Sequence, residues 1–180
     1  MFDINLFWIN PGQTEGNNLL PGLIALAAPR RAARGREHDT LILLAGIDGS
    51  ESSSGGSFNA WLYKKSEIFF QTAGTVTFAV KTFADALNKD LLERNLRRAK
   101  NGERMSASLS LAVLRRNMLY LVNFGAAKSW VAGAADAVEF TDTDNHGRGL
   151  GISEKIVCSF ATREIAENDL LIFTYKPPEI

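Results

Sequence analysis

The chain has few of the residues that build disulfides, zinc sites or membrane spans. Its one cysteine, Cys158, excludes an internal disulfide and a zinc site made of several cysteines. No run approaches the roughly 18 apolar residues that cross a bilayer. The first residues include Asp3 and lack the basic start of a secretory signal. These absences predict a cytoplasmic protein.

A charge of one sign is also lacking. Twenty Lys and Arg residues balance twenty Asp and Glu residues, and the sequence pI is about 6.7. No long-range field would draw the whole molecule to nucleic acid or to an anionic membrane, so we expect neither partner. With 180 residues and 46% hydrophobic content, residues 1–180 are predicted to form a single domain around one core. The oligomeric state stays open.

Apolar patterns predict three strands in the first fifty residues. Apolar residues alternate through 2–8, and a second candidate strand at 19–28 contains Pro21, which favours a sheet edge or a bulge. Residues 40–47 (TLILLAGI) are an unbroken apolar run, typical of a central strand that is covered on both faces. Residues 48–57 (DGSESSSGGS) are predicted to be a loop.

A basic connector precedes the unbroken apolar run. Its arginines are Arg30, Arg31, Arg34 and Arg36. It is interpreted either as a solvated hairpin loop or as a contact for an anion or a protein partner. Glu37 and Asp39 follow it and are expected to be exposed. The connector and the serine-rich loop of residues 48–57 flank the predicted strand 40–47 from opposite ends, so they are not expected to form one site.

Two helices are predicted next. Apolar residues from Phe58 to Phe69 could share one side of a helix that ends near Gly74. A stronger three- and four-residue period covers 77–100, where Asn101-Gly102 ends the helix. Its last turns are basic, which complements the helix dipole and indicates an exposed helix end. These basic residues are Arg94, Arg97, Arg98 and Lys100.

From residue 106 the pattern is strands again. The predicted strands are 106–114, 118–124, 128–132, 137–140, 155–162 and 169–175. The first two form a hairpin, and Cys158 lies on the fifth as a small apolar residue. The order of strands, helices and strands predicts an α+β fold. Two mostly antiparallel sheets would carry helices on their outer faces, in a four-layer α/β/β/α sandwich.

Three segments of the second half share a family pattern. Residues 123–128 read Asn-Phe-Gly-Ala-Ala-Lys where the pattern has Asn-x-Gly-Asp-Ser-Arg, and residues 148–151 read Arg-Gly-Leu-Gly where it has Arg-Ala-Leu-Gly. Residues 168–174 match an apolar strand, but Tyr175-Lys176 replaces its closing Asp-Gly. In order and spacing the segments resemble the metal-dependent type 2C serine/threonine protein phosphatases, in their bacterial form. The resemblance implies a shortened version of that fold.

The first half resembles the same family more loosely. Residues 45–50, Ala-Gly-Ile-Asp-Gly-Ser, stand where the family has Ala-Asp-Gly-Met-Gly-Gly. Asn17, Asn18 and Leu19 fall near its early Asn-Glu-Asp element, with Thr14 in place of an arginine that grips the substrate phosphate. The resemblance implies hydrolysis by a water that bridges two Mg²⁺ or Mn²⁺ ions.

The carboxylates that would hold those metals are missing. The degenerate ligand positions are Asn18, Gly46, Ala126 and Tyr175. Hard cations need several carboxylates, so no metal is expected, and Asp48 is the one residual candidate ligand, with a turn-forming Asp-Gly as its other interpretation. The resemblance therefore implies a catalytically inactive pseudophosphatase that binds a protein, which could be phosphorylated or a kinase, in a regulatory role.

Two other functions stay open. One is a divergent phosphatase with a reduced Mg²⁺ or Mn²⁺ site, using Asp48, Asp39 or the acids of loop 141–151, where His146 adds a further potential ligand. The other is a structural or oligomerisation domain of a larger assembly, since the Pro177-Pro178 pair is typical of a linker.

Overall fold

The computed structural model describes residues 21–48, 55–101, 104–134, 136–140 and 148–176. In chain order the elements are β1 (Leu23–Ala27), β2 (Asp39–Asp48), α1 (Gly55–Gln71), α2 (Val76–Arg98), the short helix η1 (Ala99–Asn101), β3 (Ser106–Arg115), β4 (Met118–Phe124), β5 (Lys128–Ala132), β6 (Ala137–Phe140), β7 (Ala161–Glu164) and β8 (Leu170–Thr174). The predicted strand at 2–8, Asn18, and the acids and His146 of loop 141–147 lie outside the described residues.

The larger sheet has five antiparallel strands in the order β1-β2-β3-β4-β7. Among the described strands, β1 lies at an edge of this sheet, which is one of the two placements that Pro21 favours, and β2 lies inside the sheet as predicted. β2 and β3 pair along their whole length, from Asp39 opposite Arg115 to Asp48 opposite Ser106. The predicted hairpin is confirmed as β3 and β4, which are joined by Arg116 and Asn117.

The smaller sheet has three antiparallel strands in the order β6-β5-β8. Its inward side chains, among them Val131 and Phe173, pack against the larger sheet. The outward side chains of β8 are exposed, at 61% for Leu170 and 47% for Ile172. Alternation along the strands therefore separates a buried face from an open one.

Both predicted helices are present. α2 begins after Thr75, whose Oγ1 accepts a hydrogen bond from the Phe78 backbone N–H at 3.1 Å. α1 begins at Gly55, inside the segment predicted to be a loop, and Phe58 in its first turn packs into the core on the helix side of the sheet. The amino-acid composition of the segment does not reveal this tertiary contact.

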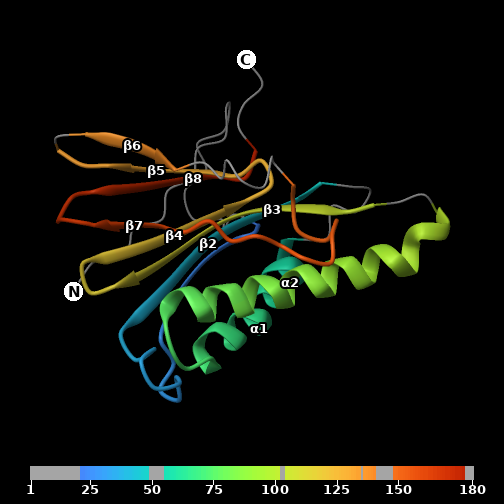
Figure 1. The fold of residues 1–180 in the computed structure, drawn as a ribbon, viewed down its shortest axis with the longest axis horizontal. Coiled ribbons are helices and arrows are strands. Elements are labelled where there is room, and N and C mark those ends of the chain that lie inside the picture. The colour runs from blue at the N-terminus through green and yellow to red at the C-terminus, as the bar shows by residue number, and fades with distance from the viewer. Residues whose placement is uncertain (1–20, 49–54, 102–103, 135, 141–147, 177–180) are drawn as a thin grey trace.

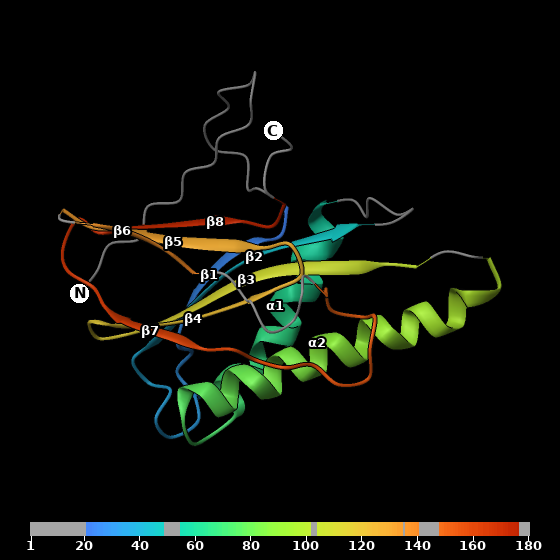
Figure 2. The same ribbon diagram turned by 45° about the horizontal axis from the view of Figure 1, so that its top comes forward.

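The helices and the small sheet lie on opposite faces of the five-stranded sheet, as Figure 1 and Figure 2 show. One apolar cluster, which includes Leu41, Phe83 and Leu111, fills the space between this sheet and the helices. A second, which includes Ile42 and Leu121, fills the space between the two sheets. The described residues thus form three layers, and no helix among them covers the outer face of the small sheet.

The strand predicted at 155–162 is wrong over its first six residues. β7 spans only Ala161–Glu164, and the preceding segment lies beside α2 (Figure 1). Cys158 is partly buried there and packs against the helix-side core. The cause is visible in the hydrogen bonds, because Asn88 of α2 binds the backbone carbonyl of Ser153 and holds the chain over the helix. Within the described part of the chain, no helix is long and apolar enough to span a membrane.

Candidate functional site

Two of the degenerate ligand positions are in direct contact. Gly46 lies near the end of β2, opposite Ser108 of β3, and Tyr175 follows β8 of the other sheet. A Cβ built on Gly46 would lie 2.6 Å from Cγ of Tyr175, which is closer than side-chain carbons approach in real structures. The tyrosine ring therefore rests on the glycine backbone, at the point where the ends of the two sheets meet.

A third degenerate position is adjacent. The backbone N–H of Ala126 donates to Oγ of Ser108 at 3.1 Å, and Ser108 is the β3 partner of Gly46. Ser110 ties β8 to the same place, since its Oγ donates to the carbonyl of Thr174 at 3.4 Å. Three positions that are 129 residues apart at their extremes, from 46 to 175, are thus brought to one edge of the sandwich.

The residues at this edge do not fit a pair of divalent metal ions. Mg²⁺ and Mn²⁺ are bound by oxygen ligands with carboxylates among them. Gly46 and Ala126 offer no side-chain oxygen, and the described residues contain no group of three His, Cys, Asp or Glu side chains that could hold a metal. Asp48 ends β2 with an exposed side chain, two residues beyond Gly46, and belongs to no such group of three within the described chain.

Residues that keep the family pattern here support the backbone. Asn123 donates from Nδ2 to the carbonyl of Phe140 at 2.7 Å and accepts from Oγ of Ser129 at 2.7 Å, so it links the two sheets. Gly125 has a φ of 69°, and a Cβ there would lie 2.6 Å from Oγ of Ser108, so only glycine fits. Asn123 and Gly125, two residues of the pattern that this chain keeps, thus support the backbone at this edge.

The segment 148–154 is held against α2 by two buried asparagines. Asn88 Oδ1 accepts from the backbone N–H of Gly151 at 2.7 Å, and its Nδ2 donates to the carbonyl of Ser153 at 2.8 Å. Asn95 Nδ2 donates to the carbonyls of Met105 and Gly151 at 2.7 and 2.8 Å. These bonds fix the Arg-Gly-Leu-Gly segment beside the degenerate edge.

Asn88→Ala is expected to lower the free energy of unfolding by about 1–2 kcal/mol, because it leaves the buried backbone groups that it binds without partners. Chemical denaturation would measure the loss. Lys89→Ala, at the next and exposed position of α2, is the matched control and should change stability little. An equal loss in both variants would contradict the role given to the asparagine.

The connector differs from the sequence expectation at two residues. Arg36 and Asp39, predicted to be accessible, are exposed by only 0% and 1%. Nη1 of Arg36 donates to Asp39 at 2.8 Å, and Arg115 of β3 donates to the same carboxylate from Nε at 2.6 Å and from Nη2 at 2.9 Å. Burial lowers the pKa of the Arg36 guanidinium, and the Asp39 carboxylate opposes that shift. Arg36 is therefore not an anion contact.

Strand alternation could have placed Asp39 correctly. Asp39, Leu41 and Leu43 lie on one face of β2, the face covered by the helices. A carboxylate on that buried face needs a charged or hydrogen-bonding partner. The partners of Asp39 are Arg36, three residues earlier in the chain, and Arg115 on the neighbouring strand. The remaining connector arginines, Arg30, Arg31 and Arg34, are exposed as predicted.

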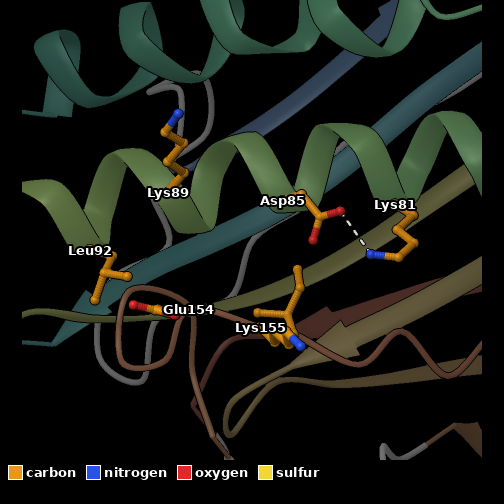
Figure 3. Close-up of a pocket in the computed structure, with 7 residues that line it drawn as sticks. Lys81, Asp85, Lys89, Leu92, Glu154 and Lys155 are labelled. Carbon is orange, nitrogen blue, oxygen red and sulfur yellow. Dashed lines mark hydrogen bonds and ion pairs between the residues drawn. The ribbon is translucent and has the colours of Figure 1, made fainter.

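A groove of about 580 Å³ lies between α2 and residues 154–156 (Figure 3). Its lining is mixed in charge. Lys81 and Asp85 point toward one another and are joined at 2.7 Å, and this hydrogen bond raises the pKa of Lys81. Glu154 and Asp85 are the carboxylates among its described lining residues, which include none of Gly46, Ala126 and Tyr175.

The sequence matches no family model and none of the curated proteins. The fold, in contrast, matches solved structures of bacterial serine/threonine phosphatases. PppA of Pseudomonas aeruginosa, a key regulatory component of T6SS, has a TM-score of 0.59 at 13% identity, over 84% of this chain and 68% of its own. The S. agalactiae serine/threonine phosphatase has a TM-score of 0.59 at 11% identity, over 83% and 76% of the two chains.

The catalytic domain of the serine threonine protein phosphatase PstP, in complex with two manganese ions, has a TM-score of 0.56 at 12% identity, over 83% and 74% of the two chains. At these identities the similarity concerns the fold. The predicted resemblance is therefore confirmed as a structural one, and the described residues have a type 2C phosphatase-like fold, an α+β arrangement of two antiparallel sheets with helices α1 and α2.

Proposed function

We propose that this domain is a catalytically inactive phosphatase-like domain, a pseudophosphatase, that acts by binding another protein in a regulatory role. The observation that carries the proposal is the packing of the Tyr175 ring on Gly46. By resemblance, these two positions would each hold a metal-binding aspartate. Here one offers no side chain and the other fills the space with an aromatic ring.

The missing carboxylates matter because of the reaction. Metal-assisted phosphate hydrolysis needs ions that lower the pKa of a bound water and neutralise charge in the transition state. Three described positions that would supply the ligands hold Gly46, Ala126 and Tyr175, and Asp48 would be left to bind a hard cation almost alone. A stable fold without this chemistry supports a role in binding.

The partner that we propose is a protein, either a phosphorylated one or a kinase. Nucleic acid and membranes are disfavoured because basic and acidic residues balance across the chain. A four-layer sandwich also remains a proposal for this fold. The exposed Leu170 and Ile172 form the kind of sheet face that a further layer would cover.

Hydrolysis of an aryl phosphate in millimolar Mn²⁺ is expected to equal a control without enzyme, and neither Mn²⁺ nor Mg²⁺ should raise the melting temperature. A ligand at a hundred times its Kd would add about 2.7 kcal/mol of stability, which is readily seen in a thermal scan. The scan thus tests metal binding separately from turnover.

An Asp48→Ala variant is the control that identifies any activity found. Metal-dependent turnover in the wild type that is lost in this variant would overturn the proposal in favour of a phosphatase with a reduced metal site. A melting shift with Mn²⁺ that persists in Asp48→Ala would place a metal site elsewhere in the chain.

A further inference from the structure

We propose that four exposed arginines at one end of the five-stranded sheet form a docking surface for a protein segment that carries clustered oxyanions, either phosphate or carboxylate. We name it the arginine surface, and it comprises Arg30, Arg31, Arg34 and Arg116. The inference rests on the proposed binding function and names its surface and the chemistry of its partner.

Three of the arginines lie on two consecutive turns of the β1–β2 connector. The first turn is closed by a hydrogen bond from the Ala32 N–H to the Pro29 carbonyl at 2.9 Å, and the second by one from the Arg36 N–H to the Ala33 carbonyl at 2.9 Å. Arg30 and Arg31 sit in the first turn and Arg34 in the second, all exposed. Arg34 is four positions after Arg30, so the Cα atoms of these two residues are at most about 14 Å apart.

The connector is held in place from beneath. The backbone N–H of Ala33 donates to the carbonyl of Phe70 at the end of α1, at 2.8 Å. Buried Arg36 donates to the carbonyl of Gly74 in the α1–α2 turn as well as to Asp39. These bonds join the base of the connector to the helices, so the arginines above it are presented by an ordered backbone.

Arg116 joins the arginine surface through its neighbour. Arg115 donates from Nη2 to the carbonyl of Gly35, which brings the β3–β4 turn against the connector. Arg116 is the next residue, exposed at the tip of that turn with a φ of 57°. Figure 1 and Figure 2 show the connector and the turn at the same end of the sheet.

The positive charge of the arginine surface is not used inside the protein. Among the described residues, no carboxylate forms an ion pair with any of the four arginines, whereas Arg36 and Arg115 share Asp39. The nearest acid in the connector, Glu37, accepts a hydrogen bond from the Gly35 N–H at 2.8 Å, and backbone hydrogen bonds lower its pKa. A second acid at this end, Glu164 of β7, accepts a hydrogen bond from Nδ2 of Asn117 in the β3–β4 turn, so both nearby carboxylates already have partners other than the four arginines.

Guanidinium groups bind phosphate and carboxylate oxygens through paired hydrogen bonds, which favours oxyanions over other acceptors. A set this small, on a molecule with no net charge, matches a short acidic segment rather than a long polyanion. The arginine surface also lies at the opposite end of β2 from Gly46, so it does not depend on the degenerate metal positions.

The test measures binding of two fluorescent peptides to the full chain by anisotropy at low ionic strength. One peptide carries phosphoserines and the other glutamates at the same positions. We expect at least one to bind, and Arg30→Glu/Arg31→Glu/Arg34→Glu to weaken it about tenfold or more, since three surface charges are reversed. Arg116→Glu alone should weaken it less. Comparing the peptides distinguishes phosphate from carboxylate.

The matched control reverses three exposed lysines elsewhere, Lys64→Glu/Lys89→Glu/Lys100→Glu, and should bind like the wild type. Three results would overturn the inference: no binding of either peptide, equal loss in the control, or tighter binding of a single-stranded DNA of equal charge. The hydrolysis and metal tests are independent of this outcome. Hydrolysis of the aryl phosphate would refute the pseudophosphatase proposal. An arginine surface that binds neither peptide would refute only the docking surface proposed here.

Discussion

Asp39→Ala is expected to lower the free energy of unfolding by about 3–5 kcal/mol, the usual cost of removing one partner from a buried ion pair. The carboxylate accepts hydrogen bonds from two arginines, at 2.6 to 2.9 Å, and Arg36 is fully buried beside it. Nε of Arg36 has no hydrogen-bond partner within the described residues. Removing the Asp39 carboxylate would leave this buried guanidinium without its compensating negative charge as well. Urea denaturation would measure the change.

Two further variants separate charge from packing. Arg115→Gln keeps the buried pair between Arg36 and Asp39, so it should cost less than Asp39→Ala. Arg36→Met/Asp39→Leu replaces the pair with apolar side chains and should recover much of the stability, because no buried charge then remains unpaired. A loss of less than about 1 kcal/mol for Asp39→Ala would show that the pair is not buried in solution.

Gly46→Ala is expected to cost about 2–3 kcal/mol, which is typical of an added methyl group that forces a packed ring to move. The new Cβ would overlap the Tyr175 ring. Tyr175 is 40% exposed, so the ring can be displaced toward solvent, and the cost is the loss of its packing. Thermal or urea unfolding of the variant would give this value.

A double-mutant cycle tests the contact itself. In a Tyr175→Ala background, Gly46→Ala should cost much less, so the two substitutions should show a coupling energy of about 1–2 kcal/mol. Tyr63→Ala serves as the control background, because Tyr63 is exposed to a similar extent, 41%, and lies on α1. Additive effects in both backgrounds would mean that Tyr175 does not rest on Gly46, and the main support for the pseudophosphatase proposal would be lost.

Local patterns in the sequence predict most elements of the fold. The unbroken run of β2, the alternation in β3 and β4, and the helical period of α2 each depend on residues that are close in the chain. The start of α1 and the departure of residues 155–160 from the sheet depend on Phe58 and Asn88, whose contacts are distant in sequence. Local periodicity does not carry that information.

The candidate sites, like the fold, were predictable from the sequence only in part. The absence of carboxylates at Gly46, Ala126 and Tyr175, the positions that the resemblance assigns to metal ligands, is readable in the sequence. The contact between Gly46 and Tyr175 is not, because it joins two different sheets. The sequence groups Arg36 with the other arginines of the connector, and its burial beside Asp39 depends on a salt bridge that composition does not reveal.

The length of β2 separates the exposed charges at its two ends electrostatically. Its ten residues span about 30 Å at about 3.3 Å per residue. Mobile ions screen exposed charges beyond roughly 8 Å at physiological ionic strength. An acidic ligand on the arginines would therefore exert almost no field at Gly46 and Tyr175. A signal between the ends would instead travel mechanically, through the elements that the connector contacts, which are the β2–β3 ladder and the two helices.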